Sequence, residues 1–147
     1  MTAVGALDLR IPSDLREIEP VVAEVVRSCL AHAFAHAFAQ RQLAFNLPVA
    51  LTEALSNAIL RGNREDAEKW VRVRVQFADR EVIVEVEDQG EGFDLEACTT
   101  DPTTPENLYR EDGRGLFLMR ALMDRVERFH GEGNVVRLTL RSAEHAA

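Results

Sequence analysis

The sequence predicts an α+β fold: a two-layer α/β sandwich whose sheet, antiparallel or mixed but mostly antiparallel, is covered on one face by helices. Apolar and polar residues alternate along 71–77 and 82–88, which is typical of strands with one buried face. Helix signals instead dominate two earlier segments, from about 20 to 41 and from 48 to 62. Shorter strand patterns complete the sheet, at 6–11, near 125–130 and at 134–141.

The length and the charge balance narrow the classes of function. We expect one domain spanning 1–147, because a chain of 147 residues with 46% apolar side chains can bury one core. With 17 basic and 25 acidic side chains the net charge is −8, which argues against a surface that binds DNA or RNA by charge. Lys69 is the only lysine and follows no glycine, so a phosphate-binding loop of the glycine-lysine type is excluded.

Cysteine usage and hydropathy favour a cytoplasmic protein. Cys29 and Cys98 lie far apart in the sequence and are expected to be free thiols in a reducing compartment. The longest uncharged run, Ser28 to Gln40, is too short to span a bilayer, and residues 1–10 lack a signal-peptide pattern. We therefore expect neither a membrane nor a nucleic acid as a direct partner.

The first elements are an edge strand and a helix. The strand covers 6–11, and Ser13 or Asp14 can cap the helix that follows. Pro20 suits the first turn of this helix, which is predicted to run to about Arg41.

A short tandem, AHAFAHAFAQ over 31–40, lies at the end of that predicted helix. At helical spacing His32 and His36 share one face, and Phe34 and Phe38 share another. Histidines so arranged could bind a metal, or they could form a solvated or interface face.

The second helix is expected to open at Asn46 and Pro48 and to close at Gly62. The two strands after it form a hairpin around a turn at Asp79 and Arg80. The core-facing residues of this hairpin are Val71, Val73, Val75, Phe77, Val82, Val84 and Val86.

An irregular stretch over 95–113 contains two prolines and many turn formers, which is typical of a lid, a binding loop or a disordered segment. Gly113, Arg114 and Gly115 are predicted to precede a helix from Leu116 to about Met123. The two final strands then follow, separated by a glycine-rich turn at 131–133.

Three segments contain candidate functional residues, and the first segment lies in the second predicted helix. Glu53 and Asn57 lie four residues apart and share a stripe beside an apolar one. This pair is either exposed to solvent or faces a pocket. In a pocket the carboxylate could act as a general base and the amide oxygen could bind Mg²⁺.

The second place is the sequence from Asp88 to Gly92. Asp88 keeps the inward parity of its strand, so its carboxylate needs a hydrogen-bond donor, such as the amino group of a bound base. Gly90 and Gly92 allow the chain to turn and to approach a ligand closely. The alternative is a tight turn with a capping aspartate.

The third place is the segment from Gly113 to Leu116 at a helix start. Free amide groups and the helix dipole make such an end suitable for anions. Arg110 and Arg114 could add positive charge toward phosphates. A plain glycine-rich loop is the alternative.

The order of these motifs resembles that of the Bergerat-fold ATPases, the superfamily that includes gyrase and the histidine kinases. Two segments, from Glu53 to Gly62 (EALSNAILRG) and from Gly113 to Asp124 (GRGLFLMRALMD), are similar in sequence to the anti-sigma-factor serine kinases of bacterial partner-switching systems. The resemblance covers nearly the whole chain, and it implies the Bergerat ATP-binding fold.

The resemblance implies a role for each matching residue. Glu53 would be the catalytic base, and Asn57 would coordinate Mg²⁺ on the phosphates of ATP. Asp88 would bind the adenine amino group, with Gly90 and Gly92 beside the base.

The remaining implied positions lie in the lid and at two places where this sequence differs from the residue usual in the family. Residues 95–113 would form the ATP lid. Gly113 and Gly115 would give amides to the phosphates beside Arg110, Arg114 and Leu116. Arg61 stands where relatives often have histidine, and Asn134 where they place threonine; Asn134 shares the inward parity of its strand and could still bond adenine.

The resemblance implies a serine/threonine kinase that uses ATP and Mg²⁺, phosphorylates a STAS-type antagonist and sequesters a sigma factor, commonly as a homodimer. One alternative is an ATP-dependent regulator that clamps a partner without phosphorylating it. The catalytic domain of a histidine kinase is a further alternative, but His32 and His36 are each followed by alanine and not by an acidic residue.

Overall fold

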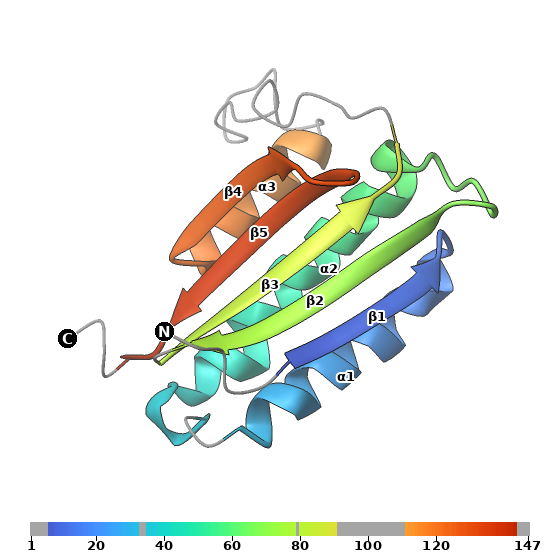
Figure 1. Cartoon of the computed structure of the whole chain (residues 1–147). Coiled ribbons are helices and arrows are strands. Elements are labelled where there is room, and N and C mark those ends of the chain that lie inside the picture. The colour runs from blue at the N-terminus through green and yellow to red at the C-terminus, as the bar shows by residue number, and fades with distance from the viewer. Residues whose placement is uncertain (1–5, 33–34, 79, 91–110, 144–147) are drawn as a thin grey trace.

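Five strands form one antiparallel sheet in the order β1-β2-β3-β5-β4 (Figure 1). The computed structural model describes residues 6–32, 35–78, 80–90 and 111–143. All four strand pairings within these residues are antiparallel, so the sheet is antiparallel and not mixed. The strands are β1 (Ala6–Pro12), β2 (Trp70–Ala78), β3 (Glu81–Asp88), β4 (Arg125–His130) and β5 (Asn134–Arg141).

Three helices cover one face of this sheet, which confirms the two-layer sandwich (Figure 1). They are α1 (Ile18–Leu30), α2 (Leu47–Asn57) and α3 (Glu111–Leu122). The core lies between the two layers, because the alternating apolar residues of the strands meet the apolar stripes of the helices. Its fully buried members include Val71, Val73, Val75, Val84 and Leu138 from the sheet, and Val25, Leu47, Leu51, Leu55 and Ile59 from the helical layer.

The other face of the sheet carries a charged ladder. Arg74 lies 3.3 Å from Glu85, which in turn lies 2.8 Å from Arg137. Nearer the edge, Arg72 pairs with Asp8 of β1 at 2.6 Å. Opposite charges on neighbouring strands stabilise the pairing of the strands while this face meets water.

The first helix ends at Leu30, so the prediction that it reaches Arg41 was wrong. The chain turns instead, and the ring of His32 stacks on Phe77 of β2 with 4.0 Å between ring centroids. A short 3₁₀ turn, Ala35–Ala37, follows. His32 and His36 therefore do not share a helical face, and the described residues contain no group of three potential metal ligands.

The second helical segment starts earlier than predicted. Helical backbone begins at Gln40, and Asn46 lies inside the helical segment. The side chain of Asn46 donates to the carbonyl of Leu122 at 3.0 Å instead of capping α2. The predicted end at Gly62 is confirmed. Turns of π-helix lie on both sides of α2, at Gln42–Asn46 and at Ala58–Gly62.

The segment Gln42–Gly62 is long and apolar enough to cross a membrane by length and composition. It is nevertheless a core helix, because α2 packs against the sheet and against both other helices. Its apolar residues therefore serve the core of the domain.

Helix α3 also starts earlier than predicted, at Glu111 and not at Leu116. Gly113 and Gly115 thus lie inside its first turns, and residues 111–113 are helical and not part of a loop. Packing accompanies the earlier start, because Gly115 lies against α2, where a Cβ would be 3.0 Å from Oε2 of Glu53, and Leu116 after it is buried in the core. The rest of the predicted lid, 95–110, lies outside the described residues.

Cys29 is a free thiol on the buried side of α1, as predicted. Burial raises the pKa of this thiol to about 12, so it stays protonated at physiological pH. Cys98 lies outside the described residues.

Candidate active site

The carboxylate of Asp88 stands at the end of β3 with only 5% of the residue exposed. Its Oδ1 atom accepts hydrogen bonds from the backbone N–H of Gly90 at 2.9 Å and from Nδ2 of Asn134 at 3.0 Å. Burial raises the pKa of Asp88 above its ordinary value, while these two hydrogen bonds act in the opposite direction. A buried carboxylate held in this way is an acceptor aimed at a specific donor.

Three glycines allow the backbone to close around this carboxylate. A Cβ at Gly62 would lie 2.3 Å from Oδ2 of Asp88, and a Cβ at Gly90 would lie 1.8 Å from the carbonyl oxygen of Gly62. On the other side, a Cβ at Gly133 would lie 2.0 Å from the carbonyl oxygen of Asp88. A larger residue at Gly62 would displace the carboxylate of Asp88, and one at Gly90 or Gly133 would need a shift of the backbone. The end of the second helical segment, the end of β3 and the start of β5 therefore form one unit.

Asn63 ties this unit to β1 and β2 at the same end of the sheet, and sequence reasoning missed it. The residue is 1% exposed. Its Oδ1 accepts from the backbone N–H of Gln89 at 2.8 Å, and its Nδ2 donates to the carbonyl of Trp70 at 2.8 Å and to Oγ of Ser13 at 2.9 Å. The signal in the sequence was a polar residue directly after the helix-ending Gly62.

The π-helical turn Ala58–Gly62 explains how Asn63 reaches these partners. The backbone N–H of Asn63 donates to the carbonyl of Ala58, five residues earlier, at 2.8 Å. This wider turn delivers Gly62 and Asn63 to the end of β3, and such turns are frequent at functional sites.

Glu53 and Asn57 form a second part of the site, on the face of α2 that meets α3. Both are partly buried, and a Cβ at Gly115 would lie 3.0 Å from Oε2 of Glu53 and 3.5 Å from Nδ2 of Asn57. The beginning of α3 therefore packs against this pair. Neither side chain is fully exposed to solvent.

The amide of Asn57 fits a role as a magnesium ligand. Its Nδ2 atom is buried and has no hydrogen-bond partner within the described part of the chain. This buried NH₂ group is a hydrogen-bond donor, and a phosphate oxygen is the kind of acceptor that it lacks. The atom of Asn57 that could bind Mg²⁺ is its amide oxygen Oδ1, a hard ligand of the kind that this ion prefers.

The N-terminal turn of α3 supplies positive electrostatic potential at the same place. The first four N–H groups of an α-helix lack acceptors within the helix, and the helix dipole adds a partial positive charge there. Gly113 belongs to this first turn because α3 begins at Glu111. Gly115 is two residues further on, and its contribution is the space that it leaves beside Glu53.

The other predicted positions divide into two groups. Arg61 is exposed beside Gly62, and Leu116 is a core residue that anchors α3 with 1% exposure. Gly92 and Arg110 lie outside the described residues, as does the side chain of Arg114. Their predicted roles stay predictions.

Comparisons with known proteins identify the family of this chain. Residues 11–140 match the family model described as the histidine kinase-like ATPase domain. The chain is 29% identical over 143 residues to the Serine-protein kinase RsbW of Bacillus velezensis, covering 94% of this chain and 86% of the relative. It is 27% identical over 138 residues to the protein of the same name from Bacillus subtilis, covering 90% of this chain and 83% of the relative.

A shorter match is to the Serine-protein kinase RsbW of Staphylococcus epidermidis, 33% identical over 92 residues and covering 58% of this chain and 57% of the relative. The family model spans most of the chain, and the helical layer, the strands β2, β3 and β4 and the buried Asp88 lie within the matched range. The chain therefore belongs to the histidine kinase-like ATPase family.

Proposed function

We propose that this chain is an ATP-dependent serine/threonine protein kinase of the anti-sigma type. In this proposal it phosphorylates a STAS-type antagonist and sequesters a sigma factor, in the cytoplasm and through protein contacts alone. The names of the relatives as serine-protein kinases support the kinase activity. The acidic net charge of −8 supports protein partners over nucleic acid.

The observation that carries the proposal is the position of Glu53 and Asn57 at the beginning of α3. A carboxylate, an unpartnered amide and the positive end of a helix together suit a phosphate group that is being transferred. Asp88 lies beside Gly62, at the end of the same helical segment, and is surrounded by glycines. Its carboxylate suits the amino group of the adenine of ATP.

The proposed reaction is direct transfer of the γ-phosphoryl group to a hydroxyl of the partner. Glu53 accepts the proton of this hydroxyl as its oxygen bonds to the γ-phosphorus, and the bond to the β-phosphate oxygen breaks to release ADP. Asn57 would hold Mg²⁺, which when bound neutralises the charge that develops on the phosphates. Amides in the first turn of α3, including that of Gly113, would bind phosphate oxygens.

The decisive experiment mixes the protein with Mg-ATP and purified STAS-domain proteins encoded near its gene. Phosphoserine or phosphothreonine on the STAS protein, detected by mass spectrometry, supports the kinase. Tight ADP binding and ATP-dependent capture of the partner without any transfer would instead favour the non-catalytic clamp. Phosphohistidine on the protein itself would overturn the assignment in favour of a histidine kinase.

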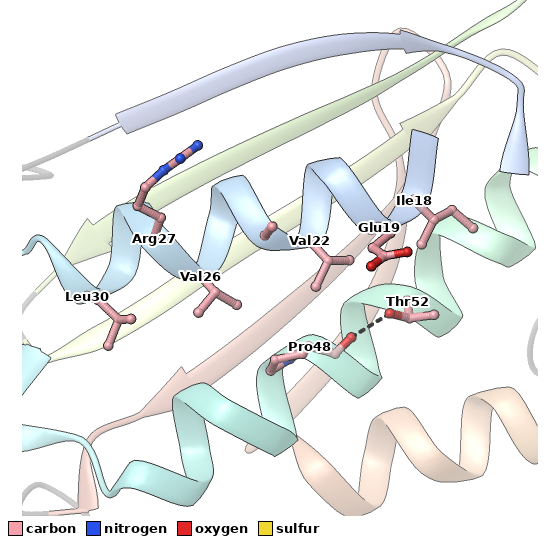
Figure 2. A pocket seen from close by; sticks show the side chains of 9 residues that line it. Ile18, Glu19, Val22, Val26, Arg27, Leu30, Pro48 and Thr52 are labelled. Carbon is pink, nitrogen blue, oxygen red and sulfur yellow. Dashed lines mark hydrogen bonds between the residues drawn. The ribbon is translucent and has the colours of Figure 1, made fainter. Parts of the chain in front are cut away.

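We also propose that the protein is a homodimer that uses an apolar groove between α1 and the start of α2. The groove has a volume of about 580 Å³. Figure 2 shows that Ile18, Val22, Val26 and Leu30 point from α1 into the groove, opposite Pro48 of α2. These four recur at every fourth residue, and Leu30 is 60% exposed.

A second copy of this chain fits the groove by charge as well as by apolarity. Glu19 lies near one end of α1 and Arg27 lies near the other. In an antiparallel two-fold arrangement Glu19 of one copy therefore approaches Arg27 of the other. Light scattering after size exclusion should give the mass of a dimer for the wild type and of a monomer for Val22→Glu. Gln76→Glu, on the open face of the sheet, should stay dimeric, and a monomeric wild type would exclude this interface.

A further inference from the structure

The side chain of Asn134 makes its hydrogen bonds within the protein, beside Asp88 in the proposed base-binding part of the site. Position 134 faces Asp88 directly in the register of β5 and β3. Instead of reaching toward a base, Nδ2 of Asn134 donates to Oδ1 of Asp88 at 3.0 Å and to the carbonyl of Gly90 at 2.7 Å. Both hydrogens of the amide are therefore used within the protein.

These contacts make the two oxygens of Asp88 unequal. Oδ1 accepts from Asn134 and from the N–H of Gly90, which uses both of its lone pairs. Oδ2 accepts no hydrogen bond within the described residues and lies on the side of Gly62. The carboxylate consequently offers one oxygen to a ligand.

A single acceptor oxygen distinguishes the two purines. Adenine presents an amino group at C6, which one oxygen can accept. Guanine presents a carbonyl oxygen at C6, which Oδ2 would repel, and its two neighbouring donors, N1–H and the 2-amino group, need both oxygens of a carboxylate. Because Asn134 occupies Oδ1, guanine cannot recover affinity by turning its donor edge toward Asp88.

We infer that Asn134 is a specificity-determining residue, which holds Asp88 as a one-oxygen acceptor so that the site admits adenine and rejects guanine. The inference rests on the proposed nucleotide site, but it concerns binding and not phosphoryl transfer. Asn134 acts through Asp88 and is a positioning residue in this sense.

The test compares ADP and GDP affinities by isothermal titration calorimetry on the full chain. The wild type should prefer ADP by more than tenfold. In Asn134→Val the ratio of the two affinities should fall by about tenfold, the change expected for one hydrogen bond to a charged group, with part of the fall coming from a gain in GDP affinity. Asn134→Thr, which has one hydroxyl hydrogen for two acceptors, should give an intermediate ratio.

The controls separate specificity from folding and from kinase activity. Thr139→Val, on the same strand but far from Asp88 along β5, should leave the ratio unchanged. If Asn134→Val does not fold, Asn134→Thr provides the measurement, and the native circular dichroism spectrum of each variant is required. An unchanged ratio in a folded Asn134 variant, or a wild type that binds no ADP, would overturn the inference. Normal ADP preference without phosphoryl transfer would overturn only the kinase.

Discussion

Gly62 lies so close to Asp88 that a Cβ at position 62 would fall 2.3 Å from one carboxylate oxygen and 2.4 Å from the carboxyl carbon. The helix-ending glycine of the second helical segment is therefore also one wall around the carboxylate that we propose binds the base. This contact couples the position of the helix that carries Glu53 to the orientation of Asp88, which gives the first prediction.

Gly62→Ala should displace the carboxylate of Asp88 and weaken ADP binding by at least tenfold. The overpacked contact should also lower the free energy of unfolding by roughly 1–3 kcal/mol. Calorimetry and urea denaturation measure the two effects. Gly131→Ala is the matched control, because a Cβ there would meet nothing closer than 3.4 Å. Wild-type ADP affinity in Gly62→Ala would show that Asp88 does not bind the base.

Glu53→Gln should abolish phosphoryl transfer and leave nucleotide binding intact. The substitution keeps the shape of the side chain but removes the base, and loss of a general base typically lowers a rate by about 10²–10⁴. Single-turnover transfer to the STAS partner and ADP titration measure the two properties. Glu68→Gln, an exposed residue before β2, should transfer at the wild-type rate. Transfer at a wild-type rate in Glu53→Gln would mean that another group takes the proton.

Asp88→Asn should change how stability depends on pH. Burial raises the pKa of Asp88 above 3.8, so the folded protein holds this proton more tightly than the unfolded chain does. The stability that this group contributes is complete below pH 3.8 and is lost as the pH rises through the raised pKa. The asparagine cannot ionise, so the variant should gain stability relative to the wild type as the pH rises over the same range.

Urea denaturation of both proteins from about pH 4 to about pH 8 tests this linkage. The difference in unfolding free energy between Asp88→Asn and the wild type should grow with pH and then level off. A difference that is constant over the whole range would indicate an ordinary pKa for Asp88. The same variant should bind ADP more weakly than the wild type, because a neutral amide replaces the carboxylate that is proposed to accept from the amino group of adenine.

Asn63→Ala should be among the most destabilising polar substitutions in the domain. It would leave the N–H of Gln89 and the carbonyl of Trp70 without their partners, at about 1–3 kcal/mol for each buried group. Asn63→Asp keeps the acceptor for Gln89, but it loses both donated bonds, buries a charge and sets a carboxylate oxygen against the carbonyl of Trp70. Thermal and urea denaturation should therefore show that Asn63→Asp is no more stable than the alanine variant.

Ser13→Ala is the control for this prediction, because it removes one partner of Asn63 at the far end of the network. It should lower stability less than Asn63→Ala and leave ADP affinity unchanged. Equal stability of Asn63→Ala and the wild type would mean that water replaces the lost hydrogen bonds.

The strands could be predicted because the alternation of apolar and polar residues that marks them is a local pattern in the sequence. Alternation placed the strands at 71–77 and 82–88, and the structure extends each by only one or two residues, to Trp70–Ala78 and Glu81–Asp88. The inward parity of Asp88 followed from the same pattern. That Asn134 stands directly opposite Asp88 also needed the strand register, which the sequence does not contain.

The helix boundaries were less predictable because tertiary contacts decide them. The alanine-rich segment after Leu30 has no proline or glycine to end a helix, yet the chain turns there and His32 packs on Phe77. Two glycines favoured a loop before Leu116, yet packing of Gly115 beside Glu53 accompanies an earlier helix start. The π-helical turn before Asn63 depends on one backbone hydrogen bond and has no pattern of its own.

The edge position of β1 has a consequence for how the domain folds. The hairpins β2–β3 and β4–β5 join neighbouring segments, whereas β1 pairs with β2 across a stretch that contains all of α1 and α2. Contacts across so long a stretch carry a large loop-closure entropy and form slowly. The N-terminal strand of this sheet is therefore expected to dock last, on strands that the rest of the domain has already assembled.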